Sequence, residues 1–291
     1  MRLFLYITLL LMPLKTTARQ GLATANITDE QQLLELLDSH IGKRAEYARK
    51  KEAKIKQMKL RLRTADNNTS RLVFLNSIYQ AYYTYNYDSA MVYVNRGLAL
   101  AQSENNAYYT TLNQISRAAV LSTGGFYEQS EKLLEEIGKR GMPASLKQYY
   151  YYTQAWLYNY WEAFCNKSEF TGYYHKKKSE SLQLAVDATS RKDVALRAYL
   201  CGELAFMDSP LSKNVLNNYT KALDNSPVNS RVHASAAYAI ARYHREMGDM
   251  KLYEKYILEG AISDMVCPLK EHLAWQEFST YLYENDAKYA N

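Results

Sequence analysis

The sequence predicts an all-α protein: a right-handed array of antiparallel helix pairs that follows a long N-terminal helix. Three observations lead to this prediction. The chain has only 5 Pro and 11 Gly in 291 residues, too few for the many tight turns of an all-β protein. Hydrophobic residues make up 47% of the chain, which is too apolar for a disordered protein. Segments in which apolar residues recur at helical spacing follow one another along the chain.

The first 25 residues have the pattern of an export signal. Arg2 supplies a positive start, and an apolar run from Leu3 to Met12 follows. Ala23-Thr24-Ala25 is a small-residue cleavage pattern. We therefore expect a signal peptide at residues 1–25 and an exported chain, with an uncleaved anchor as the other interpretation.

Residues 26–64 are predicted to form one long, basic, amphipathic helix. Its apolar residues recur at steps near three and four, at Leu33, Leu34, Leu37, Ile41, Tyr47, Ile55, Met58 and Leu62. No Pro interrupts it, and Gly42 is its single weak point. Ten Lys or Arg and only two Glu lie between Lys43 and Arg63, so this stretch carries a charge of +8.

The basic residues of this helix suggest an anionic partner. The residues considered for such a role are Lys50, Lys51, Lys54, Lys59 and Arg61. An exported chain meets no nucleic acid to regulate, so an anionic membrane surface at residues 43–63, or an acidic partner, fits better. The simpler interpretation is a solvated helix face.

Residues 65–291 contain a recurring spacing. Tyr87, Ala90, Val94 and Gly97 are three, four and three residues apart, and the same steps separate a second set. That set is Tyr127, Ser130, Leu134 and Ile137. Shorter versions occur at Tyr219, Ala222 and Pro227, and at Tyr253, Ile257 and Gly260. These positions resemble the tetratricopeptide (TPR) repeat, in which small residues let two helices approach and large residues fill the next groove. About five helical hairpins are expected, although residues 150–210 match the pattern poorly.

A narrower resemblance rests on residues across most of the chain. The matching positions are Leu37, Asp38, Ile41, Arg44, Tyr47, Lys51, Glu52, Ile55, Tyr87, Asp88, Ser89, Ala90, Ala261, Ile262, Asp264, Lys270, Glu271, Leu273 and Ala274. They resemble a family from Bacteroidota whose function is uncharacterised. This resemblance implies an exported, periplasmic TPR-like region, usually followed by a transmembrane helix, a coiled coil and a helix-turn-helix DNA-binding domain. It implies no catalytic residues.

The final residues, ENDAKYAN, would end the chain inside a half-built hairpin. An uncovered apolar face is costly in a repeat array. The last repeat is therefore expected to be incomplete and the sequence to be part of a longer protein. A natural polar cap is the other interpretation.

The run QYYYYTQAWLYNYW at residues 148–161 is rich in aromatic rings. Tyr149, Tyr152, Trp156 and Tyr160 fall on one face of a helix. Such a helix is normally packed between neighbours, and one or two rings could face a concave groove. The candidate partner-binding residues are Tyr82, Tyr83, Asn113, Arg117, Tyr158, Tyr243 and His244.

The sequence contains no recognisable catalytic motif. It has no P-loop, dinucleotide fingerprint, zinc-protease motif or nucleophile elbow. The five His show no ligand spacing. No catalytic residue, metal ligand or cofactor is predicted, and the chain is expected not to be an enzyme.

These observations favour a periplasmic, non-catalytic interaction or sensor scaffold of a membrane-linked, transcriptional regulator. It would bind a protein or peptide partner, or a ligand, on its concave face, and the chain could form a homodimer. One alternative is a stand-alone adaptor for envelope assembly. Another, less favoured, is a glycan-active enzyme on a helical frame, which would need two close carboxylates in an aromatic cleft.

Overall fold

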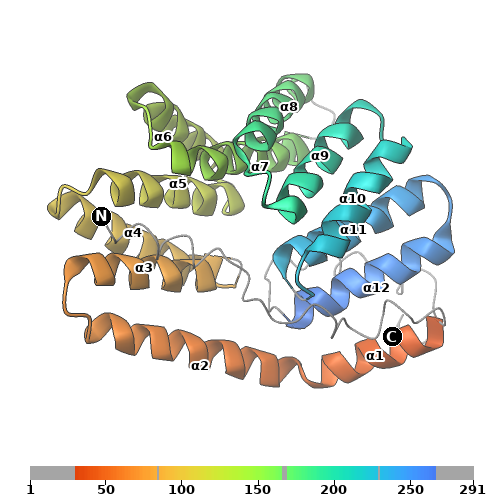
Figure 1. Ribbon diagram of the computed structural model, residues 1–291, viewed down its shortest axis with the longest axis horizontal. Coiled ribbons are helices and arrows are strands. Elements are labelled where there is room, and N and C mark those ends of the chain that lie inside the picture. Colours follow the sequence, from red (N-terminus) through yellow and green to blue (C-terminus); the bar gives the residue numbers. More distant parts are fainter. Residues whose placement is uncertain (1–29, 84, 166–168, 229, 267–291) are drawn as a thin grey trace.

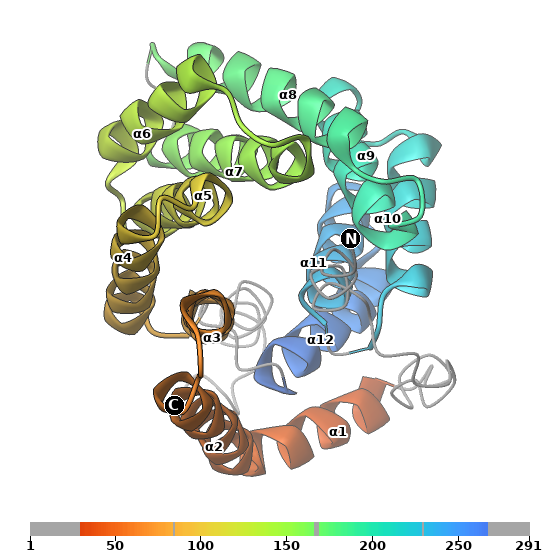
Figure 2. The same ribbon diagram turned by 60° about the vertical axis from the view of Figure 1, so that its left-hand side comes forward.

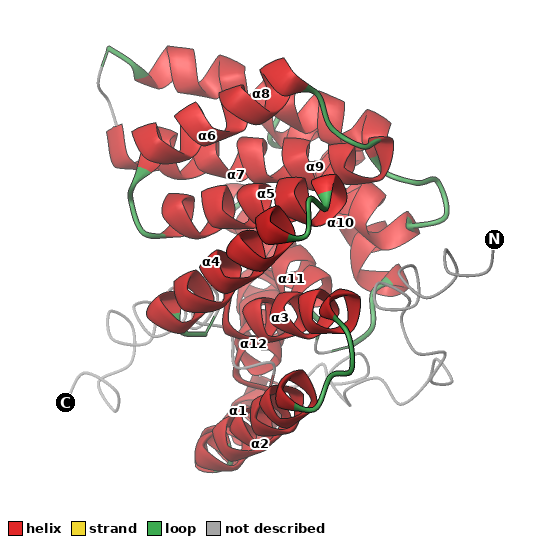
Figure 3. Cartoon of the chain, turned by 90° about the vertical axis from the view of Figure 1, so that its left-hand side faces the viewer, coloured by secondary structure: helices red, strands yellow, loops and turns green. Residues whose placement is uncertain are grey.

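The computed structural model describes residues 30–83, 85–165, 169–228 and 230–266 (Figure 1). Every regular element in these residues is a helix (Figure 3). The α-helices are α1 Glu30–Gly42, α2 Arg44–Arg63, α3 Asn68–Tyr83, α4 Tyr87–Ser103, α5 Ala107–Thr123, α6 Tyr127–Arg140, α7 Lys147–Cys165, α8 Thr171–Ala188, α9 Val194–Asp208, α10 Lys213–Asn225, α11 Arg231–Glu246 and α12 Met250–Val266. The predicted all-α class is confirmed.

Helices α3 to α12 form five consecutive hairpins. The pairs α3–α4, α5–α6, α7–α8, α9–α10 and α11–α12 each pack closely, and neighbouring hairpins also touch. This is the arrangement of a TPR-like repeat array. The predicted stack of helix pairs is therefore confirmed, including the central pair that the spacing did not reveal.

The repeated small and large residues lie where the helices meet. Ala90 and Val94 of α4 are fully buried, as are Leu134 and Ile137 of α6. Parts of the shorter versions lie on α10, with Tyr219 and Ala222, and on α12, with Tyr253 and Ile257, the second helices of their hairpins. Gly202 of α9 shows why small residues are needed, because a Cβ there would lie 2.5 Å from ring atoms of Tyr219 on α10. Where the pattern occurs, it thus marks the interface within a hairpin.

Polar side chains begin several of these helices. Asn86 accepts a hydrogen bond from the Ser89 backbone N–H at the start of α4. Asn106, Asp193 and Ser230 cap α5, α9 and α11 in the same way. Each cap satisfies an otherwise free backbone donor and stabilises the helix by about 1 kcal/mol.

The long N-terminal helix is divided, in contrast to the single helix expected. Helix α1 ends at Gly42 and α2 begins at Arg44, with Lys43 at φ −94° and ψ 0° between them. Gly42 is the position that the sequence marked as weak, since Gly in a helix costs about 1 kcal/mol relative to Ala. The break redirects α1, so that it leaves the line of α2 (Figure 1).

The break lets the two halves pack on opposite ends of the array. Helix α2 packs on α3 through Ile55 and Leu62. Helix α1 packs on α12, where Leu37 joins a buried cluster that contains Ile257 and Ile262. Figure 2 shows the hairpins following a curved path, with α1 returning to α12. The described chain is therefore closed on itself by α1.

Some expectations fall outside the described residues. The predicted export signal at residues 1–25 and the incomplete final repeat both lie there. Within the described ranges, none of the helices combines the length and apolar character that crossing a membrane requires.

Candidate functional site

The first helices of four hairpins meet around a small cavity on the inner side of the curve. It encloses about 50 Å³ and is lined by Gln80, Tyr83, Ala119, Ser122, Tyr149, Tyr152, Thr153, Trp156, Tyr160 and Arg231. These residues come from α3, α5, α7 and α11. We call this set the inner aromatic cavity. Figure 2 shows these helices on the inner side of the array, with α4, α6, α8 and α10 outside them.

Helix α7 supplies half of the cavity wall. Its residues Tyr149, Tyr152, Trp156 and Tyr160 are spaced three, four and four apart, so they lie along one helix face. The rings of Tyr152 and Trp156 stack with centroids 4.7 Å apart and planes 11° apart. Stacked rings of this kind stabilise one another by about 0.5–1.5 kcal/mol beyond their burial. The cavity therefore has a stiff aromatic wall.

Hydrogen bonds fix the hydroxyl of Tyr149, which belongs to this wall, and the hydroxyl of the neighbouring Tyr79. The hydroxyls of Tyr149 and Tyr79 are 3.0 Å apart, and the Tyr149 hydroxyl donates to Ser116 Oγ at 3.3 Å. Burial raises the pKa of Tyr149, and it raises the pKa of Tyr79 well above its ordinary value. Both phenols stay neutral at physiological pH, so they act as polar hydrogen-bonding groups and not as charges.

Arg231 brings a positive charge to the cavity from the far end of the array. Its guanidinium lies over the Tyr83 ring, 5.3 Å from the centroid, and so links the start of α11 to the end of α3. Its charge opposes the rise in the pKa of Tyr149. Such cation–π contacts contribute about 0.5–2 kcal/mol.

Thr153 adds a polar atom that the described residues leave unused. Its side chain is 3% exposed, and its hydroxyl has no hydrogen-bond partner among them. A buried hydroxyl without a partner costs about 1–3 kcal/mol. The cavity thus combines aromatic rings, a cation and a hydroxyl, a set suited to binding a chain with apolar groups and a hydrogen-bonding or anionic group.

The structure does not bring the seven predicted binding residues together. Tyr83 lines the inner aromatic cavity. The other six, which lie elsewhere, are Tyr82, Asn113, Arg117, Tyr158, Tyr243 and His244.

Most of these six have structural contacts. Asn113 is buried and donates to the Tyr109 carbonyl on its own helix. Tyr158 is buried and donates to Glu131 at 2.9 Å, and Tyr243 donates to the Leu211 carbonyl. A role for these residues in binding stays a prediction.

The remaining three differ in exposure. Tyr82 is buried beneath Lys59 of α2. His244 is half-buried and stacks on Tyr256, with centroids 5.9 Å apart. Arg117 is exposed. None of the three reaches the inner aromatic cavity.

The α7 residues of the cavity carried a signal in the sequence, since their helical spacing placed them on one face. The sequence predicted that most of these rings pack between helices and that one or two could face a groove; in the structure Tyr149, Tyr152 and Trp156 pack against buried clusters and also line the cavity. Thr153 and Arg231 carried no signal, because their position depends on how the hairpins stack.

The predicted basic residues do not form one surface. Lys59 donates to the Tyr82 hydroxyl at 2.8 Å, and Lys51 lies over the Tyr85 ring. Lys50 pairs with Glu46 at 2.6 Å, a contact at the surface. Lys54 and Arg61 are exposed. The helix therefore points its cations in several directions.

A buried serine, histidine and glutamate were not singled out in the sequence. Ser226 Oγ and His233 Nδ1 are 3.2 Å apart, and His233 Nε2 and Glu259 Oε1 are 3.1 Å apart. The Ser226 hydroxyl donates its proton to the Leu223 carbonyl, so it does not present that proton to His233 as a hydrolase nucleophile would. The trio instead joins α10, α11 and α12.

The inner aromatic cavity also lacks the carboxylates of a glycoside hydrolase, since none of its described lining residues is Asp or Glu. Among the residues that the structure describes, no group of His, Cys, Asp or Glu could hold a metal ion.

The stacked hairpins and their inner cavity define a TPR-type interaction scaffold. The family model of the SusR N-terminal TPR domain matches residues 41–290. The chain therefore belongs to this family, and the family predicted from the sequence is confirmed. No curated protein matches the chain. TPR-type families are generally non-catalytic scaffolds.

Proposed function

We propose that the chain is the partner-binding sensor of a membrane-linked transcriptional regulator and that it works in the periplasm after export directed by residues 1–25. The observation that carries this proposal is the inner aromatic cavity, in which α7 aromatics, Thr153 and Arg231 converge. Membership of the SusR N-terminal TPR family supports it. Repeat arrays of this kind use their concave surfaces for binding.

The chemistry of the cavity favours a protein or peptide partner. An apolar or aromatic side chain of the partner would pack against Trp156 and Tyr160, and a carboxylate or carbonyl would meet Arg231. The cavity is only about 50 Å³, so a side chain, and not a whole small molecule, would enter it. The rest of the partner would lie along the inner helices.

Closure by α1 provides a route from binding to signalling. A partner that fits a more open or a tighter curve would change the packing of α1 on α12, because it would bind the two shapes with different affinity. Among the described side chains of α1 only Leu37 is buried, so its contact with α12 depends on few residues. The change would pass to a following membrane segment.

The test compares inner and outer surfaces. A partner captured from a periplasmic extract is purified, and its affinity is measured for Tyr160→Ala/Arg231→Gln and for the outer-face control Leu184→Ala/Lys176→Gln. The inner variant should bind more than about tenfold more weakly, and the control should match the unchanged chain. Equal affinity for all three proteins would exclude binding at the inner face.

The link to a regulator needs a separate test. The reading frame past codon 291 should encode a transmembrane helix and a helix-turn-helix domain. A stop codon at that point would favour the stand-alone envelope adaptor instead.

A further inference from the structure

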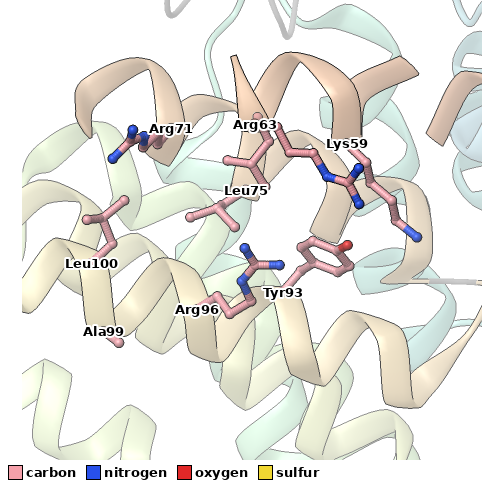
Figure 4. A pocket seen from close by; sticks show the side chains of 9 residues that line it. Lys59, Arg63, Arg71, Leu75, Tyr93, Arg96, Ala99 and Leu100 are labelled. Atoms are coloured by element: carbon pink, nitrogen blue, oxygen red, sulfur yellow. The ribbon is translucent and has the colours of Figure 1, made fainter. Parts of the chain in front are cut away.

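A second and larger cavity lies at the start of the array, between α2, α3 and α4. It encloses about 520 Å³ and is lined by Lys59, Leu62, Arg63, Arg71, Leu75, Tyr93, Arg96, Ala99 and Leu100 (Figure 4). We call it the basic cleft. It shares no residue with the inner aromatic cavity.

The basic cleft concentrates positive charge. Four of its residues are cations: Lys59, Arg63, Arg71 and Arg96. None of them forms an ion pair with a carboxylate in the part of the chain that the structure describes. Carboxylates act on two of the cations from outside the lining: Glu52 attracts Lys59, and Arg71 donates to Asn68, whose amide donates to Glu104 at 2.8 Å. None of the described residues that line the cleft is acidic, so the four like charges repel one another there.

Three of the four cations gather at one end of the basic cleft. Figure 4 shows Arg63 of α2 above the Tyr93 ring of α4, with Lys59 on one side of that ring and Arg96 on the other, while Arg71 lies at the other end beside Leu100. Lys59 Nζ and the Arg96 guanidinium lie 5.6 Å and 5.3 Å from the Tyr93 ring centroid. The cleft thus offers a cluster of cations around one aromatic ring.

Tyr82 holds Lys59 in this position. Its hydroxyl accepts a hydrogen bond from Lys59 Nζ at 2.8 Å, and this bond is the main cause that raises the pKa of Lys59. Lys59 therefore stays charged and is held beside the Tyr93 ring before any anion arrives. A donor that is already in place loses less entropy on binding.

We propose that the basic cleft binds a phosphate-type oxyanion carried on a small molecule or a lipid headgroup. Three cations at one end of the cleft are balanced better by a ligand with more negative charge than the −1 of a carboxylate. A phosphate monoester carries a charge of about −1.5 to −2 at pH 7. The planar forks of Arg63 and Arg96 match pairs of phosphate oxygens. Leu62, Leu75 and Leu100 give the body of the ligand an apolar wall, and the volume lies in the range of small-molecule sites.

The first experiment titrates inorganic pyrophosphate into the purified chain by calorimetry at constant ionic strength. The cleft variant is Arg63→Gln/Arg96→Gln, and the matched control is Arg44→Gln/Arg49→Gln, which removes the same charge from exposed positions of α2 outside the cleft. Saturable binding should weaken at least about tenfold in the cleft variant, since each charged hydrogen bond to a phosphate is strong. The control should change less than about twofold.

Thermal unfolding shows whether the variants are folded. Both substituted residues of the cleft variant are exposed, so its midpoint should match or exceed that of the unchanged chain. Acetate serves as a carboxylate probe and should bind far more weakly than pyrophosphate. Equal binding of acetate would overturn the preference for phosphate.

A second set of measurements separates the two sources of phosphate. Vesicles of phosphatidylcholine with phosphatidylglycerol are compared with vesicles of phosphatidylcholine alone, using the same three proteins. Vesicle binding that fails only in the cleft variant assigns the site to a headgroup, and saturable pyrophosphate binding without vesicle binding assigns it to a free ligand. Failure of both probes to bind, or equal weakening in the cleft variant and the control, would overturn the proposal.

Discussion

Replacement of Leu37 by Ala should release α1 from α12. Leu37 is 2% exposed and packs in the cluster with Ile257 and Ile262. Removing its three outer carbons costs about 0.8 kcal/mol each in burial, or about 2.4 kcal/mol, before any cavity is counted. At 1.4 kcal/mol for each factor of ten, the equilibrium for opening should shift about fiftyfold. Helix α1 has only 13 residues, so it would not remain helical without its packing.

Hydrogen–deuterium exchange read by mass spectrometry measures this opening directly. Amides of α1 should exchange about fiftyfold faster in Leu37→Ala, while those of α3 to α10 stay protected. If the packing of α1 on α12 contributes less than about 2.4 kcal/mol, the α1 amides should lose all protection. The control is Ile41→Ala on the same helix, where the side chain is 38% exposed and little should change. Equal effects of the two substitutions, or faster exchange throughout the array, would refute the idea that α1 is a separate closing element.

The remaining predictions concern single packed or titrating groups. Gly202→Ala should lower the free energy of unfolding, measured in urea, by about 1–3 kcal/mol, because its Cβ would meet the Tyr219 ring. The control Gly172→Ala has open space around its Cβ and should be neutral or stabilising. Equal effects of the two substitutions would contradict this close packing of α9 on α10. Tyr219→Phe should cost about 1–2 kcal/mol, since its hydroxyl donates to Glu203 at 2.8 Å, and a cost near zero would show that this bond adds nothing. Burial lowers the pKa of His244 from 6.5, so the unfolded chain binds the proton more readily and stability should fall as the pH drops from about 7.5 to 5.5. His244→Gln should flatten that part of the curve of unfolding midpoint against pH, and an unchanged slope would show that His244 does not contribute.

The repeat pattern predicted the architecture because it records local contacts. Ala90 and Leu134 are fully buried at positions where the spacing required small and large residues. These residues pack against the other helix of the same hairpin, which is close by in the sequence, so the contact leaves a local pattern of residue types. The central hairpin was harder to see, because α8 lacks the spacing found on α4 and α6.

The closed shape and the cavities could not be predicted in this way. Leu37 meets Ile257 across more than 200 residues, and Arg231 meets Tyr83 across almost 150. These contacts depend on the accumulated curvature of five hairpins, to which every interface contributes a small rotation. The basic cleft likewise combines Lys59 from the expected basic helix with Arg71 and Arg96 from later helices, and no spacing in the sequence links them.

The central claim is that a partner binds the inner face. A photo-crosslinking amino acid placed at Tyr160, on the inner face, is compared with one at Leu184, which is 43% exposed on α8. After irradiation in cells, position 160 should give one discrete adduct that Arg231→Gln abolishes, and position 184 should give none. An adduct from position 184 alone, or one from position 160 that survives Arg231→Gln unchanged, would contradict the account.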